Sequence, residues 1–201
     1  MELNIRDIEQ KLNKKVRLNT ISIGFDVAEH FTGICVLRTD TKTIYIEDLQ
    51  KIETNPKDDI KNRMSSFIGA IDKFKQQIKK YKGYRIIVIE DSWFGFGNVV
   101  VLKNLTRFAT LLWNSFYKEC DYIEFLLPTS ARSQIRFNKN TQLEQTELPI
   151  EKFKRGKNIG KPKKVDIKKL IQEYLYKSFN IEIKDTDESD SFVLALAGLL
   201  R

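Results

Sequence analysis

The sequence predicts an α/β protein built on a mixed five-stranded sheet with helices on both faces. Three β-rich segments, at 20–26, 32–39 and 43–49, are separated by turn-sized connections, which is typical of an antiparallel meander. Two further apolar segments, 84–90 and 121–128, alternate with helical stretches, as parallel strands do. An antiparallel layer joined to two parallel strands is therefore expected, with helices packed on either side of it.

The helices are predicted from apolar residues that recur at three- and four-residue steps. The stretch 55–82 opens with Asn55 as the expected cap and Pro56 at the expected first helical position. Its apolar face comprises Ile60, Met64, Phe67, Ile71, Phe74 and Ile78. Apolar stretches at 99–120 and 165–179 predict two further helices.

At 201 residues the chain is long enough for one domain with a buried core. We expect residues 1–18 to form a short amphipathic helical extension and residues 19–201 to form a single folded domain. Within that domain, a basic loop is expected at about 138–164. Its part from 152 to 164 has seven basic residues among thirteen, no acid, two glycines and a proline, which favours a loop over a helix.

The charge balance indicates a polyanionic partner. The net charge is +8 and the pI is about 9.3. In the basic loop, Lys161, Lys163 and Lys164 are candidate phosphate contacts, although such a loop can also be merely solvated. Arg132, which follows Pro128, is a further candidate for a phosphate contact.

Several classes of protein are disfavoured by the composition. No run of about 18 apolar residues exists, so no membrane span is expected. The polar N-terminus does not resemble a secretory signal. Cys35 and Cys120 lack the spacing of a metal site, so we expect free thiols in a cytoplasmic protein.

Acidic residues gather at the start of the last apolar segment. The stretch "DTDESDSFVLALAGLL" (185–200) predicts a helix, capped by Thr186 or Asp187, that is apolar all round. On it Asp187 and Asp190 are three residues apart and share one face. Acids at a helix N-terminus can simply offset the helix dipole, so the stretch alone leaves both a structural and a chemical interpretation open.

Two more acids stand at predicted strand ends. Asp26 ends the first strand and Glu90 ends the fourth, and the carboxyl ends of neighbouring parallel strands meet at one edge of a sheet. Asp91 is the alternative to Glu90, but side chains alternate across a strand, so the two acids point to opposite faces. Ile86 and Val88 favour Glu90 as the residue that shares the face of the site.

Together these four acids make a candidate metal site of oxygen ligands alone. Carboxylates without His or Cys suit Mg²⁺, with Mn²⁺ as a substitute, rather than zinc. Two such ions about 4 Å apart can activate water and stabilise the leaving oxygen of a phosphodiester. The acids would then hold the metal ions while the basic residues elsewhere bind nucleic acid.

At this point the chain resembles a known family. The segments "IGFDVAEHFTGICVL", "IIVIEDSWFG" and "DESDSFVLALAGLL" are similar to the three signature segments of RuvC-type Holliday junction resolvases, within the RNase H-like superfamily. The resemblance implies an Mg²⁺-dependent endonuclease that resolves four-way junctions by paired symmetric nicks. It implies Asp26, Glu90, Asp187 and Asp190 as the metal-binding catalytic acids, with two ions per active site.

The same resemblance suggests roles for other residues. Trp93, with Phe94 beside it, matches an aromatic that lies near the junction centre, although such a cluster can also be a core or dimer contact. Lys164 is similar to a basic residue at the rim of the family's active site. The helix that carries Leu102, Leu105 and Leu112 would form the interface of a homodimer, as two symmetric cuts require.

The chain also departs from the family pattern. Val27, Ala28 and Glu29 follow the first acid, where the family commonly has a small residue or Pro and then Gly or Ser. The amino-terminal segment is additional, and 129–164 is longer than usual. These departures place it nearer divergent phage or viral resolvases and leave open its sequence preference and any branch-migration motor.

Other function classes fit the sequence less well. Actin-like and sugar-kinase ATPases share an acid after the first strand, but nine glycines and no second phosphate loop argue against them. A non-catalytic junction-binding module would not need all four acids. A fork, flap or RNA–DNA hybrid nuclease of the same fold remains an alternative that the sequence does not separate from a resolvase.

Overall fold

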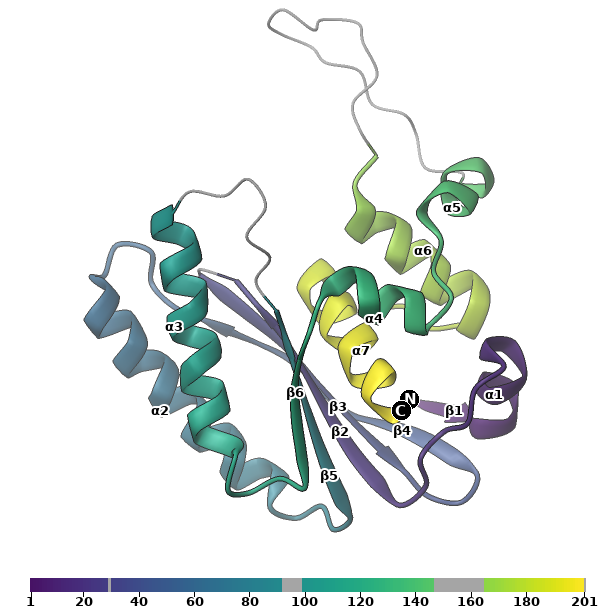
Figure 1. Cartoon of the computed structure of the whole chain (residues 1–201), viewed down its shortest axis with the longest axis horizontal. Helices are drawn as coiled ribbons and strands as arrows, with labels where there is room; N and C mark the ends of the chain where they lie inside the picture. The colour runs from purple at the N-terminus through teal and green to yellow at the C-terminus, as the bar shows by residue number, and fades with distance from the viewer. Residues whose placement is uncertain (29, 92–98, 147–164, 201) are drawn as a thin grey trace, which may run out of the picture.

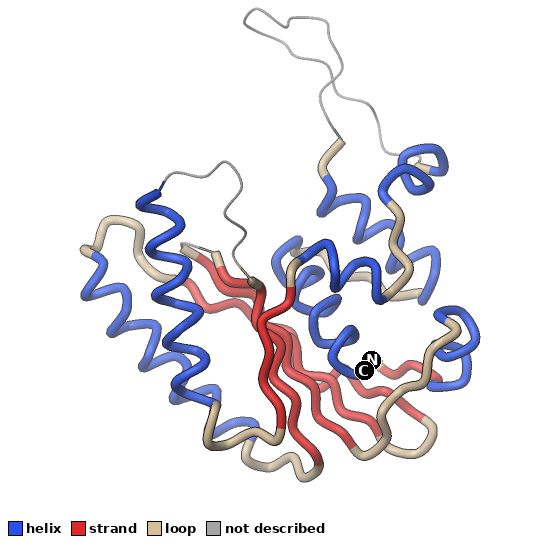
Figure 2. Tube along the Cα trace, viewed as in Figure 1, coloured by secondary structure: helices blue, strands red, loops and turns tan. Residues whose placement is uncertain are grey.

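The computed structural model describes residues 1–28, 30–91, 99–146 and 165–200. Within these ranges six strands form one twisted mixed sheet in the order β1-β4-β3-β2-β5-β6 (Figures 1 and 2). The strands are β1 Glu2–Asn4, β2 Thr20–Val27, β3 Phe31–Thr39, β4 Thr43–Glu53, β5 Tyr84–Glu90 and β6 Tyr122–Leu126. The β1–β4, β4–β3 and β3–β2 pairs are antiparallel, whereas β2, β5 and β6 are parallel.

Helices cover both faces of this sheet (Figure 1). The helices are α1 Ile5–Leu12, α2 Ile60–Ile78, α3 Val99–Phe116, α4 Pro128–Gln134, α5 Lys139–Gln145, α6 Ile167–Phe179 and α7 Thr186–Leu199. Helices α2 and α3 bury their apolar faces against one side of the sheet. Helix α7 lies on the other side, with α1, α4 and α6 completing the core around it.

The predicted α/β architecture is confirmed, including the three-strand meander, the two parallel strands and the helices on both faces. The sequence predicted five strands, and the described residues form six, because β1 pairs with β4 at the edge of the sheet. Three residues are too few to reveal a period, so β1 could not be read from the sequence. The helix expected within 1–18 is present as α1, and its Ile5, Ile8 and Leu12 are buried in the core beside α7.

Three local expectations differ from the structure. Helix α2 begins at Ile60 with Asp59 as its cap, while Asn55 makes a preceding turn by accepting the Lys57 N–H. The expected basic loop at 138–164 begins with helix α5, which Asn138 caps. The strand expected at 121–128 ends at Leu126, and Pro128 instead opens helix α4, because proline suits the first turn of a helix.

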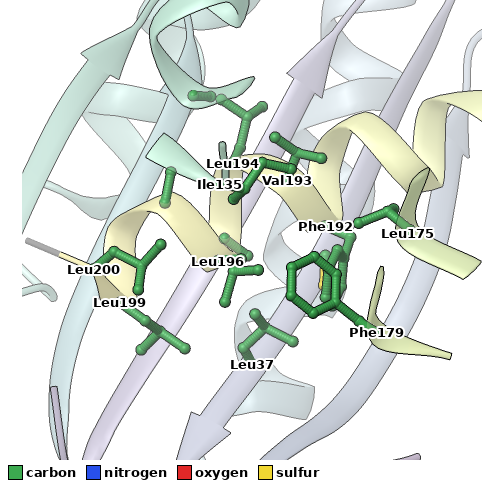
Figure 3. Packing of buried hydrophobic residues seen from close by; sticks show 14 of the residues in the cluster. Leu37, Ile135, Leu175, Phe179, Phe192, Val193, Leu194, Leu196, Leu199 and Leu200 are labelled. Atoms are coloured by element: carbon green, nitrogen blue, oxygen red, sulfur yellow. The ribbon is translucent and has the colours of Figure 1, made fainter. Parts of the chain in front are cut away.

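Helix α7 is the central buried element. Figure 3 shows Leu196 of α7 near Leu37 of β3, and Val193 on another side of the helix near Ile135, which follows α4. Burial on several sides explains why the segment is apolar all round rather than amphipathic. In the described residues, no helix is long and apolar enough to cross a membrane.

Small residues let α7 lie directly on the strands. A Cβ at Gly24 of β2 would come within 2.2 Å of the Ser191 carbonyl oxygen, and one at Gly33 of β3 within 2.3 Å of the Asp187 carbonyl oxygen. Either contact is shorter than any real Cβ makes, so a side chain at these positions would push the helix away. Ser22 adds a buried hydrogen bond from its hydroxyl to the carbonyl of Ala195. The glycines therefore fix where the acidic N-terminus of α7 lies.

Candidate active site

The candidate site lies where the carboxyl ends of β2 and β5 meet the N-terminus of α7. Strands β2 and β5 are parallel neighbours in a register that pairs Phe25 with Ile89. Asp26 and Glu90 follow this pair directly, so they emerge side by side. Glu90 hydrogen-bonds Asp26, and the negative charge of Asp190 also acts on it.

The side-chain parity of β5 places Glu90 on the α7 face of the sheet. Ile86 and Val88, which alternate with it, pack in the core that contains α7, whereas Ile87 and Ile89 pack against α2 and α3. Asp91, the alternative acid, is exposed beyond the strand. Glu90 is therefore the acid of this pair that joins the site.

The N-terminus of α7 contributes the other two acids. Asp185 is its cap and accepts hydrogen bonds from the backbone N–H groups of Asp187 and Glu188, so the expected caps Thr186 and Asp187 are instead the first two helical residues. Asp187 and Asp190 are three residues apart and face the strand ends. Asp190 is only 7% exposed, and Asp26 opposite it is 4% exposed.

A lysine from α6 joins three of the four acids. The Lys168 ammonium lies 3.1 Å from Asp26 Oδ2, 2.8 Å from Asp187 Oδ1 and 3.2 Å from Asp190 Oδ2. It thus bridges β2 and both acids of α7. Sequence reasoning did not single out this residue, although a signal was present. Lys168 precedes Ile171 and Leu175 by three and seven residues, so it lies on the buried stripe of its helix.

Two more cations hold the outer oxygens of the α7 acids. Arg132 of α4 lies 3.2 Å from Asp190 Oδ1. Lys51 of β4 lies 2.9 Å from Asp187 Oδ2 and 3.1 Å from Asp185 Oδ2, and its ammonium is 4.4 Å from the centroid of the Phe31 ring. Each of Asp187 and Asp190 therefore has one oxygen on Lys168 and the other on a second cation.

Burial and mutual repulsion shift the protonation of these acids. Burial, the hydrogen bond with Asp26 and the nearby negative charges raise the pKa of Glu90 well above its usual range. Burial likewise raises the pKa of Asp190 despite Arg132 and Lys168. Burial acts in the same direction on Asp187, but hydrogen bonds from Lys168 and Lys51 outweigh it and lower the pKa of that carboxyl.

The pKa of Lys168 is raised, whereas burial lowers the pKa of a lysine that has no acidic partner. Burial acts to lower it, but the charges of Asp26, Asp187 and Asp190 outweigh burial and raise it. The ammonium therefore stays charged at neutral pH and neutralises part of the acid cluster. The raised pKa of Glu90 favours its protonated form.

The donor set fits a hard divalent cation in kind. Four carboxylates without nitrogen or sulfur ligands are what Mg²⁺ and Mn²⁺ select. Among the described residues, however, no three acidic, His or Cys side chains stand close enough together to hold one ion. The Lys168 ammonium lies between three of these acids, with its nitrogen 2.8–3.2 Å from their carboxylate oxygens. Mg²⁺ binds oxygen at roughly 2.0–2.1 Å, so the same carboxylates would have to move inward to bind this ion.

The remaining sequence-predicted site residues lie in three places. Trp93, Phe94, Lys161, Lys163 and Lys164 lie outside the described residues. Arg132 lies at the site, paired with Asp190. Of the three leucines expected on a dimer surface, Leu102 is partly exposed, Leu105 packs at the margin of the core, and Leu112 is 0% exposed within the subunit. The apolar excess of α3 is thus used partly by its own core.

At the level of sequence, no protein-family model and no curated protein matches the chain. Solved structures do match its fold. A Thermus thermophilus RuvC in complex with a Holliday junction substrate superposes with a TM-score of 0.57 at 9% identity, over 88% of this chain and 91% of that one. Another Thermus thermophilus RuvC structure gives 0.56 at 10% identity, over 88% and 92%.

A eukaryotic enzyme has the same architecture. The yeast mitochondrial Holliday junction resolvase Ydc2 gives a TM-score of 0.50 at 12% identity, over 96% of this chain and 82% of that chain. The match to three structures extends over most of each chain, although sequence identity is low throughout. The mixed sheet with helices on both faces thus belongs to a chain with a RuvC-like fold.

Proposed function

We propose that this protein is a divalent-metal-dependent endonuclease that cuts branched DNA and resolves four-way junctions by paired symmetric nicks. One observation carries the proposal. Four acids from three elements gather at the carboxyl ends of β2 and β5, where three of them share the Lys168 ammonium and the fourth, Glu90, is acted on by the charges of Asp26 and Asp190. The RuvC-like fold and the net charge of +8 support a nucleic-acid substrate.

Asp26, Glu90, Asp187 and Asp190 would hold the metal, Mg²⁺ or Mn²⁺, in two ions per site. Bound there, the ions would activate water and stabilise the leaving oxygen of the scissile phosphodiester. The chain's own residues supply the framework for this chemistry. Glu90 must release the proton that its raised pKa retains, because a ligating carboxylate is ionised.

Arg132 and Lys51 would act as positioning residues. Each holds the outer oxygen of one α7 acid, which fixes the rotation of that carboxylate while its inner oxygen faces the strand ends. Lys51 is itself held between Asp185, Asp187 and the ring of Phe31. A carboxylate with one oxygen held by Lys51 or Arg132 keeps its orientation when a different cation binds its other oxygen.

We assign DNA binding to basic and aromatic residues that the sequence singles out. Lys161, Lys163 and Lys164 are proposed to contact phosphates, and Trp93 and Phe94 to stack on bases at the branch point. Arg132 remains a candidate phosphate contact in addition to its pairing with Asp190. Basic residues around an acidic centre would attract DNA without filling the metal site.

A homodimer is proposed on α3, because one junction must be cut at two symmetric points. The exposed residues of α3 include Val99, Val100 and Trp113, and Tyr117 follows directly after the helix. The rings of Trp113 and Tyr117 stack with centroids 4.8 Å apart and planes inclined by 6°. With Leu102 and Leu105 they form the part of α3 that a second copy could cover, whereas Leu112 is assigned to the core of the subunit.

The proposal is tested on a set of branched substrates. A mobile four-way junction, a fork, a flap and an RNA–DNA hybrid are incubated with the protein and Mg²⁺, Mn²⁺ or a chelator. Preferred cutting of the junction in a divalent cation supports the proposal. Preferred cutting of fork, flap or hybrid selects the alternative nuclease, and junction binding without any cutting indicates a non-catalytic module.

A further inference from the structure

The Lys168 ammonium lies among three of the four acids of the candidate site. It contacts one oxygen from each of Asp26, Asp187 and Asp190, and these acids come from two different elements. Asp26 and Asp190 are buried, and several buried like charges would be strongly unfavourable without a counter-charge. Lys168 therefore compensates part of the negative charge of the acid cluster.

The other two cations of the site are placed differently. On Asp190, Arg132 takes Oδ1 while Lys168 takes Oδ2. On Asp187, Lys51 takes Oδ2 while Lys168 takes Oδ1. Removal of the Lys168 ammonium would thus free one oxygen on each α7 acid and one on Asp26, while Arg132 and Lys51 keep the α7 acids oriented.

The side chain of Lys168 has a route out of the cluster. It is 34% exposed, although its ammonium is in contact with buried acids. It lies in the first turn of α6, where the backbone is fixed by the Asp166 cap and not by the ion pairs. A lysine side chain has four rotatable bonds, so the ammonium can move to solvent without any movement of the helix.

We infer that Lys168 is the internal counter-cation of the metal-free site and that a divalent cation binds by displacing its ammonium into solvent. The inference rests on the proposed metal-dependent function and adds the identity of the group that the metal replaces. It assigns different roles to three neighbouring cations: Lys168 exchanges with the metal, whereas Arg132 and Lys51 stay in place. Metal binding and the ion pairs of Lys168 are then mutually exclusive.

The exchange is measured by amine labelling of the whole protein without DNA. The protein is treated with an acetylating reagent in chelator or in Mg²⁺, and the acetylation rate of each lysine is read by peptide mass spectrometry. In chelator, Lys168 is expected to react more slowly than its exposed neighbour Lys169. In Mg²⁺, the rate at Lys168 should rise several-fold while those at Lys169 and Lys51 stay constant. An unchanged or slower rate at Lys168 in Mg²⁺ overturns the inference.

Metal affinity gives a second, independent readout. Lys168→Gln should bind Mg²⁺ more tightly than the wild type, by roughly tenfold or more, in isothermal titration. The matched control is Lys169→Gln, which removes the same charge from the adjacent exposed position and should leave the affinity within about twofold of wild type. Equal affinities for Lys168→Gln and the control overturn the displacement.

Thermal unfolding of the same variants completes the test. In chelator, Lys168→Gln should unfold at a lower temperature than Lys169→Gln, and saturating Mg²⁺ should remove most of that difference. If Lys168→Gln does not fold, the labelling of the wild-type protein still decides. If the protein binds Mg²⁺ and cleaves the junction while Lys168 stays protected from acetylation, this inference is wrong but the proposed function stands. If neither the wild type nor any variant binds Mg²⁺, both are wrong.

Discussion

Asp26 and Gly33 face each other across β2 and β3, and the missing side chain of Gly33 lets the Asp187 carbonyl lie against the sheet beside Asp26. The distance between the strand-borne acids and the helix-borne acids therefore depends on a residue that carries no chemistry of its own. The Lys168 ammonium, which bridges Asp26 and Asp187, lies at the same junction. The geometry of the acid cluster is thus set by backbone packing.

Gly33→Ala should impair the site more than the fold. A Cβ at this position would overlap the Asp187 carbonyl, so the N-terminus of α7 must shift and the four acids lose their mutual spacing. We expect at least a roughly tenfold loss of cleavage rate, and an unfolding free energy lower by about 1–3 kcal/mol. Rates of junction cleavage and denaturant unfolding measure the two effects.

Gly69→Ala is the matched control for this substitution. Gly69 lies within α2 with nothing near its added Cβ, so alanine should stabilise the helix by about 0.5–1 kcal/mol and leave cleavage unchanged. Full cleavage activity in Gly33→Ala would show that the position of the α7 N-terminus does not govern the site.

Glu90 should make the metal-free protein less stable as the pH rises. Its pKa is raised in the folded protein above the usual 4.5, mainly by burial, so between the two values the folded state holds a proton that the unfolded state has lost. Stability from this group therefore falls as the pH increases from about 4.5. Gln cannot ionise, so Glu90→Gln should gain stability over wild type at pH 8, by about 1 kcal/mol or more, and gain less at pH 5.

This pH effect is measured by thermal unfolding in chelator at both pH values. The exposed Glu182→Gln serves as the control and should shift the unfolding temperature equally at pH 5 and pH 8. An advantage of Glu90→Gln that is the same at both pH values would mean that Glu90 is already ionised in the folded protein.

Strand β5 and helices α6 and α3 differ in how much of their role the sequence could predict. Glu90 is separable from Asp91 because strand parity is local: Ile86 and Val88 report the face on which Glu90 lies. The spacing of Lys168 from Ile171 and Leu175 puts it on the buried stripe of α6, but the acids that it contacts depend on how α6 packs against α7, which the sequence does not show. The prediction that Leu112 meets a partner is not met, because an apolar excess on a helix does not reveal whether its own core or a second subunit covers it.

Trp113→Glu should weaken a dimer built on α3. Trp113 is 38% exposed and stacks on Tyr117, so a charge there would not disturb the subunit core but would have to be buried in the proposed interface. We expect the variant to stay folded by circular dichroism and to be monomeric by light scattering. It should retain metal-dependent nicking but lose paired cuts.

Tyr176→Glu provides the control for an exposed aromatic elsewhere. Tyr176 lies on α6 and is 56% exposed, and its substitution should leave the oligomeric state unchanged. A wild-type protein that is monomeric both free and on DNA would contradict the proposed dimer and favour the fork or flap nuclease.

The basic segment 152–164 should govern the salt dependence of DNA binding. Replacing Lys161, Lys163 and Lys164 with Ala should weaken junction binding and reduce the slope of log affinity against log salt by roughly 0.9 for each phosphate that the variant no longer neutralises. The control replaces Lys61, Lys73 and Lys79, which are exposed on or next to α2. Equal slopes for both triple variants would assign the basic segment to solvent.

Strand-resolved cleavage of a four-way junction tests the central claim most directly. Each strand is labelled in turn, and cutting in Mg²⁺ is compared for the wild type and the Asp26→Asn and Asp190→Asn variants. The account predicts paired nicks at symmetric positions on opposite strands for the wild type. Both variants should lose at least about a thousandfold in cleavage rate while binding the junction as tightly or more tightly, because each removes a proposed metal ligand and a negative charge from the path of the DNA. Near wild-type cutting by either variant would contradict the four-acid site, and single unpaired nicks by the wild type would contradict resolution of the junction.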